Sequence, residues 1–202
     1  MDQMERTRVH LVRHGQVKGY EDIPVNGHTD VELTETGMLQ MQHMAERLRL
    51  VDMDAVYSSD LKRTVLGARQ IGRYHDVPLH SMPELKESYF GDWEGMFLAD
   101  IRKRYSEELT KREADLLHYQ APGGGESLFD FSKRIMTCFD NLLEEQKGKR
   151  IAIVAHGGVN RVILCNALGM DLSQMFRIHQ EYGCLNIIDY FPGSTLVRLV
   201  NG

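Results

Sequence analysis

The sequence predicts an α/β fold, a three-layer α/β/α sandwich with a mostly parallel central sheet and a small helical cap insertion. Three observations lead to this prediction. Short apolar segments alternate with amphipathic helical patterns along the chain. Residues 151–155 form a nearly continuous apolar run, which is typical of a central parallel strand that is buried on both faces. A more polar stretch at about residues 86–125 interrupts the alternation, and we expect it to form the cap.

The first half of the chain repeats a strand followed by a helix. Residues 8–12 read as a strand and, after a long loop, Thr34 caps a helix whose apolar residues recur at helical spacing. Residues 54–58 form a second strand, and Asp60 opens a second helix. Parallel strands place their carboxyl ends at one edge of a sheet, so we expect ligands to bind at that edge.

The second half adds two helices and three more strands. A glycine-rich loop at residues 122–126 ends at Ser127, and the apolar stripe that follows predicts a helix packed against the sheet. The apolar strand 151–155 is followed at once by another helical pattern. Residues 185–190 and 195–200 predict two final strands, which complete the sheet.

The composition indicates a single globular domain over residues 1–202, of which 42% are hydrophobic. The formal net charge of −5 argues against binding to nucleic acid or to an anionic membrane, although it leaves room for one small basic pocket. The first eight residues are charged and precede no long apolar run, so we expect a cytoplasmic protein without membrane contact. The three cysteines fit neither a disulfide framework nor a paired zinc site.

Basic residues follow three of the predicted strands. Arg13 and His14 end the first strand, Arg63 lies shortly after the second, and His156 follows the strand 151–155. Because the carboxyl ends of these strands share one edge, the four side chains should form a cationic basin inside an acidic protein. A phosphate group is the ligand that such a basin would bind.

These residue types suit phosphoryl transfer. The transferring group carries negative charge on its oxygens, which preset positive charges stabilise. Arginine binds phosphate with its planar fork and keeps its proton. A neutral imidazole can attack phosphorus when a backbone carbonyl holds its other nitrogen. Gly15, after His14, lets the backbone turn close to the site.

At these positions the chain resembles the histidine phosphatase superfamily, the phosphoglycerate mutase-like proteins, over nearly its whole length. The order and spacing of several motifs carry the resemblance: Leu11-Val12-Arg13-His14-Gly15, Gly27-His28-Thr29-Asp30 with Leu33-Thr34-Glu35-Thr36-Gly37, Ser58-Ser59-Asp60-Leu61-Lys62-Arg63-Thr64, Leu85-Lys86-Glu87, Gly91-Asp92-Trp93-Glu94-Gly95, Gly124-Gly125-Glu126-Ser127 and Ala155-His156-Gly157-Gly158.

The resemblance implies a metal-independent phosphatase that works through a phosphohistidine intermediate. His14 would attack phosphorus, while Arg13, Arg63 and His156 would hold the phosphoryl oxygens. Glu87 would protonate the leaving oxygen and then activate water. The expected substrate-binding residues are Gln16, which adds a side-chain donor, together with Asn26, Gly27 and Gly157.

We expect no metal and no cofactor. The chain has nine histidines, but they show no recognisable zinc spacing, and two clamping arginines would repel a cation. The expected ligand is a small-molecule phosphate ester. The sequence leaves the oligomeric state open: residues 195–200 could pair at a sheet edge in a homodimer, or Arg198 could protect that edge.

The resemblance is strongest to the α-ribazole phosphatase group, so α-ribazole 5'-phosphate is one candidate substrate. Gln16 and Val17 stand where the mutases carry Glu-Ser, and the loop at residues 88–95 is shorter than theirs, which favours hydrolysis. Tyr20 stands where the mutases carry an asparagine that contacts phosphate, so the phosphate pocket is expected to be shaped differently there. A cofactor-dependent phosphoglycerate mutase and a broad sugar-phosphate phosphatase remain alternatives. A phosphate-binding protein without turnover is the third, but such a relative would be expected to lose His14 or Glu87, and both are present.

Overall fold

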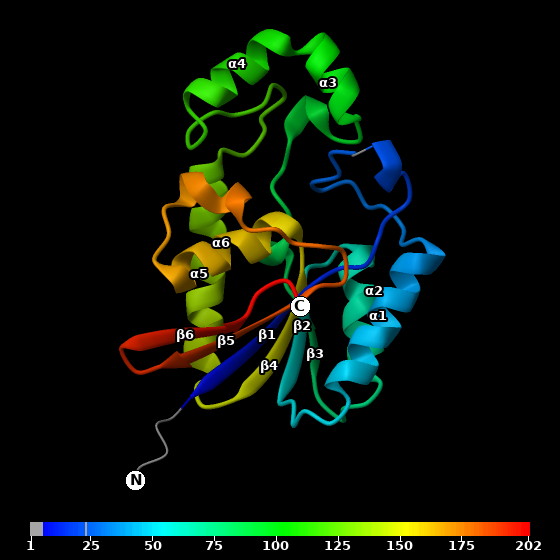
Figure 1. Cartoon of the computed structure of the whole chain (residues 1–202), viewed down its shortest axis with the longest axis vertical. Coiled ribbons are helices and arrows are strands. Elements are labelled where there is room, and N and C mark those ends of the chain that lie inside the picture. Colours follow the sequence, from blue (N-terminus) through cyan, green and yellow to red (C-terminus); the bar gives the residue numbers. More distant parts are fainter. Residues whose placement is uncertain (1–5, 23) are drawn as a thin grey trace.

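The computed structural model describes residues 6–22 and 24–202 and confirms the predicted α/β fold with a mostly parallel sheet (Figure 1). One six-stranded sheet has the order β3-β2-β4-β1-β5-β6. Strands β1 to β4 are mutually parallel, whereas β5 is antiparallel to both of its neighbours. The strands are β1 (Thr7–Arg13), β2 (Ala55–Ser58), β3 (Leu79–Ser81), β4 (Arg150–Ala155), β5 (Leu185–Phe191) and β6 (Ser194–Leu199).

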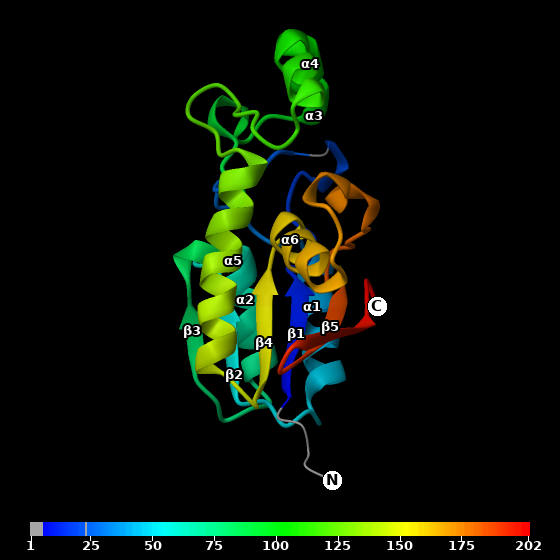
Figure 2. The ribbon, with the colours of Figure 1, turned by 90° about the vertical axis from the view of Figure 1, so that its left-hand side faces the viewer.

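Four helices cover the two faces of the sheet (Figures 1 and 2). Helices α1 (Glu35–Leu48) and α2 (Lys62–Gly72) pack on one face. Helices α5 (Leu128–Glu145) and α6 (Gly157–Leu168) pack on the other. The three predicted layers are therefore confirmed. Short 3-10 helices are η1 (Tyr20–Asp22), η2 (Pro83–Leu85), η3 (Gly91–Trp93) and η4 (Leu172–Arg177).

Strand β4 explains the continuous apolar run in the sequence. Ile151 and Ile153 point into the hydrophobic cluster under α5 and α6, whereas Ala152 and Val154 point into the cluster under α1 and α2. All four side chains are 0% exposed. Because both faces of this strand are covered, neither set of alternating positions can be polar.

The predicted helix cap at Thr34 is confirmed, whereas the predicted start of the second helix at Asp60 is not. The hydroxyl of Thr34 accepts a hydrogen bond from the Gly37 backbone, and Ser127 caps α5 in the same way. Asp60 does not cap the second helix, which begins at Lys62. Its carboxylate instead lies 3.0 Å from the Lys86 ammonium group.

Helices α3 (Leu98–Arg104) and α4 (Ser106–Ala114) lie beyond the carboxyl ends of the parallel strands (Figure 1). Buried Trp93, Ile101 and Ala121 form a small hydrophobic cluster of their own there, separate from the two clusters under the sheet. This segment therefore covers the edge at which the sequence predicts the site. Within the described residues, no helix is long and apolar enough to cross a membrane.

Candidate active site

A cavity of about 200 Å³ opens at the carboxyl ends of β1 and β4. It contains eight of the nine residues that the sequence predicts for catalysis or substrate binding; only Gln16 is outside. The lining residues are Arg13, His14, Val17, Pro24, Val25, Asn26, Gly27, Arg63, Glu87, Phe90, His156, Gly157 and Tyr182.

His14 leaves β1 with one ring nitrogen fixed. Its Nδ1 lies 2.8 Å from the carbonyl oxygen of Gly15, and because a carbonyl only accepts, Nδ1 carries the proton. The lone pair of Nε2 is then free. Burial, followed by the positive charges of Arg63 and Arg13, holds the pKa of His14 well below its usual value. The ring is therefore neutral, as a nucleophile must be.

Gly15 is required by a close approach of two backbone segments. A Cβ atom at this position would lie 2.1 Å from the carbonyl oxygen of Gly37, in the first turn of α1. Any larger residue would push α1 away from the end of β1. The glycine thus allows the helix to pack directly behind His14.

Arg13 carries an unsatisfied donor. Its Nη1 donates to the carbonyl oxygen of Gln180 at 2.5 Å, and its Cζ atom lies 3.9 Å from the centre of the Tyr182 ring. Its Nε is buried and has no hydrogen-bond partner. A buried guanidinium N–H that is unpaired beside a cavity suits an anionic ligand.

Arg63 is only 2% exposed, and neighbouring groups hold it rigidly. Its two terminal nitrogens donate to the carbonyl oxygens of Asn26, Gly27 and Thr29, at distances of 2.7 to 3.2 Å. Its Nε donates to Nδ1 of His156 at 3.3 Å. These contacts use four of the five guanidinium hydrogens, so one N–H of Nη1 remains for a ligand.

His156 ends β4 and is completely buried, and both of its ring nitrogens have partners. Nδ1 must accept from Arg63, because a guanidinium only donates. Nε2 therefore carries the proton and donates to Ser59 Oγ at 2.8 Å. Burial, and next the charge of Arg63, holds the pKa of His156 well below its usual value.

A chain of hydroxyl groups continues from His156. Ser59 Oγ lies 2.7 Å from Thr64 Oγ1, which in turn lies 2.8 Å from the carbonyl oxygen of Leu61. The single hydroxyl hydrogen of Thr64 goes to a carbonyl, so Thr64 accepts from Ser59. The hydrogen bonds from His156 to Ser59, from Ser59 to Thr64 and from Thr64 to the Leu61 carbonyl oxygen therefore all donate in the same direction. This fixes the tautomer of the imidazole.

Glu87 reaches the cavity from the loop after η2. Its Oε1 accepts from the backbone of Ser88 at 3.0 Å, and its Oε2 accepts from the backbone of Gly158 at 2.8 Å. A Cβ atom on Gly158 would lie 2.2 Å from the carboxylate, so any larger residue there would displace the carboxylate from this position. Arg134 of α5 holds the loop in place, because it donates to the Glu87 carbonyl oxygen and pairs with Glu126 at 2.7 Å.

The predicted substrate-binding residues take different positions. Asn26 and Gly27 line the cavity, and their carbonyl oxygens hold Arg63. Gly157 also lines it, and a Cβ there would lie 3.4 Å from Nε of Arg13. Gln16 does not line it: its Oε1 accepts from the hydroxyl of Thr34 at 2.8 Å, which turns the amide toward α1.

Sequence reasoning missed Glu94, a carboxylate that joins two loops at the cavity. Its two oxygens accept from the backbone of His28, Thr29 and Phe90 and from the Thr29 hydroxyl, at 2.6 to 3.0 Å. A signal existed, because Glu94 lies in the Gly-Asp-Trp-Glu-Gly motif, but that motif does not reveal its partners. Sequence reasoning also missed Tyr182 as a wall of the site, as well as the hydroxyl chain.

In the part of the chain that the structure describes, no group of three or more His, Cys, Asp or Glu side chains is arranged to hold a metal ion.

Comparison with known proteins relates the whole chain to one family. The family model for the histidine phosphatase superfamily (branch 1) matches residues 9–202. The adenosylcobalamin/alpha-ribazole phosphatase of Escherichia coli is 30% identical over 194 residues, which is 96% of this chain and 95% of that protein. A metal-independent phosphoserine phosphatase of Arabidopsis thaliana is 33% identical over 161 residues, 79% of this chain and 68% of that protein. The crystal structure of the alpha-ribazole phosphatase from Shigella flexneri has a TM-score of 0.89 at 31% identity, and the match covers 96% of each chain.

Proposed function

The chain belongs to the histidine phosphatase superfamily, as its motifs predict, and from this premise we propose that it hydrolyses phosphate monoesters through a phosphohistidine on His14. One observation supports this mechanism above all. The neutral imidazole of His14 has its Nε2 free in the same cavity as Arg13, Arg63 and His156. A nucleophile and preset positive charge thus meet at one point, as phosphoryl transfer requires.

In the first step, the lone pair of His14 Nε2 attacks phosphorus and the bond from phosphorus to the ester oxygen breaks. The free N–H groups of Arg13 and Arg63 stabilise the negative charge on the phosphoryl oxygens. Glu87 gives its proton to the leaving oxygen, so that a neutral alcohol departs. The two backbone amides that hold the carboxyl group keep it oriented toward the cavity.

In the second step, water hydrolyses the phosphohistidine. Glu87, now ionised, takes a proton from the attacking water, the bond between nitrogen and phosphorus breaks, and inorganic phosphate leaves. His14 returns to its neutral form with the proton still on Nδ1. No group other than water and the residues of the cavity is needed for this balance.

His156 assists in a way that depends on the ligand. In the structure its Nδ1 accepts from Arg63, so it has no hydrogen to give to a phosphoryl oxygen. We infer that Nδ1 takes up a proton when the dianionic phosphate group binds, because the added negative charge favours the imidazolium form. Arg63 Nε and His156 Nδ1 can then both donate to the phosphate.

α-Ribazole 5'-phosphate is the first candidate substrate, because the chain spans nearly the whole length of relatives named as alpha-ribazole phosphatases. We propose that residues 86–125 act as a cap that receives the alcohol part of the ester. A relative named as a phosphoserine phosphatase makes that ester the second candidate. The replacements at Gln16 and Val17 favour hydrolysis over mutase chemistry.

The test of this activity is the hydrolysis of para-nitrophenyl phosphate in the presence of a chelator. We expect the wild-type protein to release nitrophenol without added metal, and His14→Ala to lower the rate by at least about 1,000-fold, because the nucleophile is lost. His43→Ala on the exposed side of α1 is the matched control and should keep full activity. An unimpaired His14→Ala variant would refute the nucleophile. A panel with α-ribazole 5'-phosphate, phosphoserine and 3-phosphoglycerate then ranks the substrates.

A further inference from the structure

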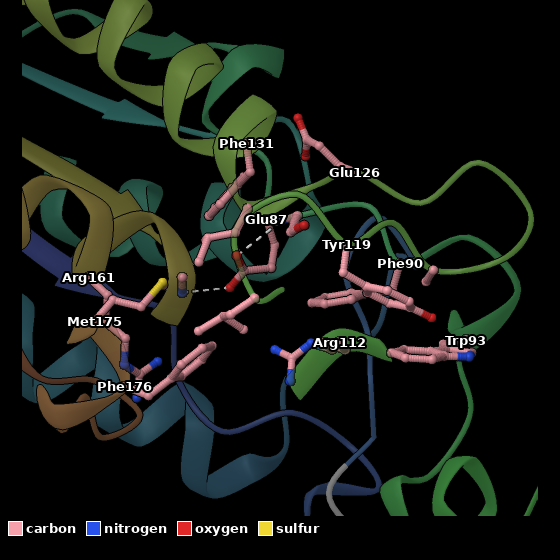
Figure 3. Close-up of a pocket in the computed structure, with 15 residues that line it drawn as sticks. Glu87, Phe90, Trp93, Arg112, Tyr119, Glu126, Phe131, Arg161, Met175 and Phe176 are labelled. Atoms are coloured by element: carbon pink, nitrogen blue, oxygen red, sulfur yellow. Dashed lines mark hydrogen bonds between the residues drawn. The ribbon is translucent and has the colours of Figure 1, made fainter. Parts of the chain in front are cut away.

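A second cavity of about 230 Å³ lies on the other side of Glu87, between the segment 86–125 and helices α5 and α6 (Figure 3). Glu87 and Phe90 line both cavities, so the two adjoin at the catalytic acid. The walls of this second cavity, the acid-side cavity, are mainly aromatic or apolar: Phe90, Trp93, Tyr119, Phe131, Met175 and Phe176. Several of these rings face the enclosed space, which suits a planar apolar group.

Two arginines also line the acid-side cavity, one from each side. Arg112 comes from α4 and Arg161 from α6, and their Cζ atoms lie 5.7 and 6.0 Å from the centre of the Phe176 ring (Figure 3). Among the described residues, no carboxylate lies within 4.0 Å of either guanidinium. Arg161 donates from Nε to the carbonyl oxygen of Ile178. Most of their N–H groups therefore have no protein partner.

No carboxylate of the described residues forms an ion pair with either of these cations, although Glu113, next to Arg112 on α4, attracts Arg112 from a distance. Glu126 lines the same cavity, but Arg134 binds both of its oxygens at 2.7 and 2.9 Å. Glu87 attracts Arg161 only from a distance, and it is needed for the proton transfer. Burial lowers the pKa of Arg112, which means that its cation is partly removed from water. Both arginines are half-buried and line the cavity, so an anionic group bound there would gain charge-assisted hydrogen bonds from their unpaired N–H groups.

On the basis of the proposed function, we propose that the acid-side cavity binds the leaving alcohol, and that it selects an alcohol with a planar apolar body and a carboxylate-like group held by Arg112 and Arg161. The ester oxygen then lies beside Glu87, with phosphate in one cavity and the alcohol in the other. The planar fork of arginine matches two carboxylate oxygens, which explains a pair of guanidiniums among apolar walls.

This requirement separates the candidate substrates. α-Ribazole supplies an aromatic ring but no second anion, whereas serine supplies a carboxylate but no ring. A volume of about 230 Å³ is smaller than the roughly 300–1,000 Å³ of sites for drug-sized ligands, so a single or fused ring fits better than a larger body. Each candidate therefore meets one part of the requirement, and a small ester that combines both features should have a higher kcat/KM than either of them.

Two matched esters test the proposal: 3-carboxyphenyl phosphate and 3-carbamoylphenyl phosphate, which have nearly the same shape but differ in charge. We expect the wild-type protein to prefer the carboxylate in kcat/KM by about 10- to 100-fold, the range expected for charge-assisted hydrogen bonds. Arg112→Gln should reduce this ratio to near one, and Arg161→Gln should reduce it in the same direction. Arg104→Gln is the matched control. The substitution removes the same charge, but Arg104 is exposed on α3 and does not line the cavity.

A wild-type ratio near one, or a high ratio that survives in both arginine variants, would overturn the proposal while leaving the phosphatase activity intact. If neither these two esters nor para-nitrophenyl phosphate were hydrolysed, the proposed function would fail instead. Binding then still tests the cavity without turnover: calorimetry should show 3-hydroxybenzoate binding at least about tenfold more tightly than 3-hydroxybenzamide, and Arg112→Gln should remove the difference. Equal binding of the two phenols would refute the anion site.

Discussion

At the scale of single residues, the protonation states of the two site histidines follow from neighbouring groups that can only donate or only accept a hydrogen bond. A guanidinium has no acceptor and a carbonyl has no donor, so Arg63 fixes Nδ1 of His156 as an acceptor, and Gly15 fixes Nδ1 of His14 as a donor. The two imidazoles therefore hold opposite tautomers, with ring centres 5.2 Å apart. His14 has the free lone pair on Nε2, and His156 can take up a proton on Nδ1.

Ser59 is expected to position His156 by accepting its Nε2 proton. Ser59→Ala removes that acceptor inside a fully buried site, and we expect kcat for para-nitrophenyl phosphate to fall about tenfold, since an unpaired buried donor costs roughly 1–3 kcal/mol. Nitrogen-15 spectra should show the Nε2–H tautomer of His156 in the wild-type protein and a mixture in the variant. Thr64→Ser keeps the hydroxyl chain and is the control. A wild-type spectrum with hydrogen on Nδ1 would contradict this assignment.

At the scale of secondary-structure elements, helix α5 positions Glu87, the proposed acid, although it contributes no residue to the phosphate cavity. Arg134, on its second turn, donates to the carbonyl oxygens of Glu84, Lys86 and Glu87 and also binds Glu126. One guanidinium thus ties the loop that carries the acid to the loop that ends at the start of α5. The helix acts as the rigid support for a proton donor that lies on irregular backbone.

Arg134→Met should therefore lower both activity and stability. We expect kcat to fall about tenfold or more, because a small displacement of Glu87 disturbs proton transfer. The free energy of unfolding should fall by about 3 kcal/mol, because Glu126 and three carbonyl groups lose their partner. Steady-state kinetics and urea unfolding measure the two effects. Lys133→Met, at the exposed neighbouring position, should change neither quantity, and an Arg134→Met protein with normal kcat would exclude this positioning role.

At the scale of the whole molecule, the sheet buries a histidine that takes no part in the site. His10 in β1 is 3% exposed, and burial lowers its pKa to about 4. In the unfolded chain the pKa of a histidine is about 6.5, so between these values the unfolded state binds a proton that the folded state excludes. Stability should therefore fall as the pH falls from about 6.5 to 4, by at most about 3 kcal/mol from this residue.

Urea unfolding at pH 7 and pH 4.5 measures this loss. His14 and His156 act in the same direction, because their pKa values are also lowered. His10→Asn keeps a donor near the Ile151 carbonyl oxygen but no longer titrates, so the variant should lose less stability between the two pH values than the wild-type protein. Equal pH dependence in both proteins would mean that His10 is not held neutral by the fold.

The sequence by itself determined the layers, most of the sheet and the centre of the site. Strand β4 was readable because a strand covered on both faces must be apolar at every position. His14 and His156 could be predicted because each follows a predicted strand, and the carboxyl ends of parallel strands meet at one edge. Strand β3 was missed, since its three residues are exposed and carry no apolar pattern. Asp60 was expected to open the second helix, which instead begins at Lys62.

Only the tertiary structure decided which partner each polar group has. The direction of the Gln16 amide, the two loops joined by Glu94 and the two arginines of the acid-side cavity depend on distances between segments that are far apart in sequence. Periodicity and capping report the local preference of the backbone, and they carry no information about such distances. Long-range contacts form when the packed core brings distant segments together, so the chemistry between those segments becomes visible only in the folded chain.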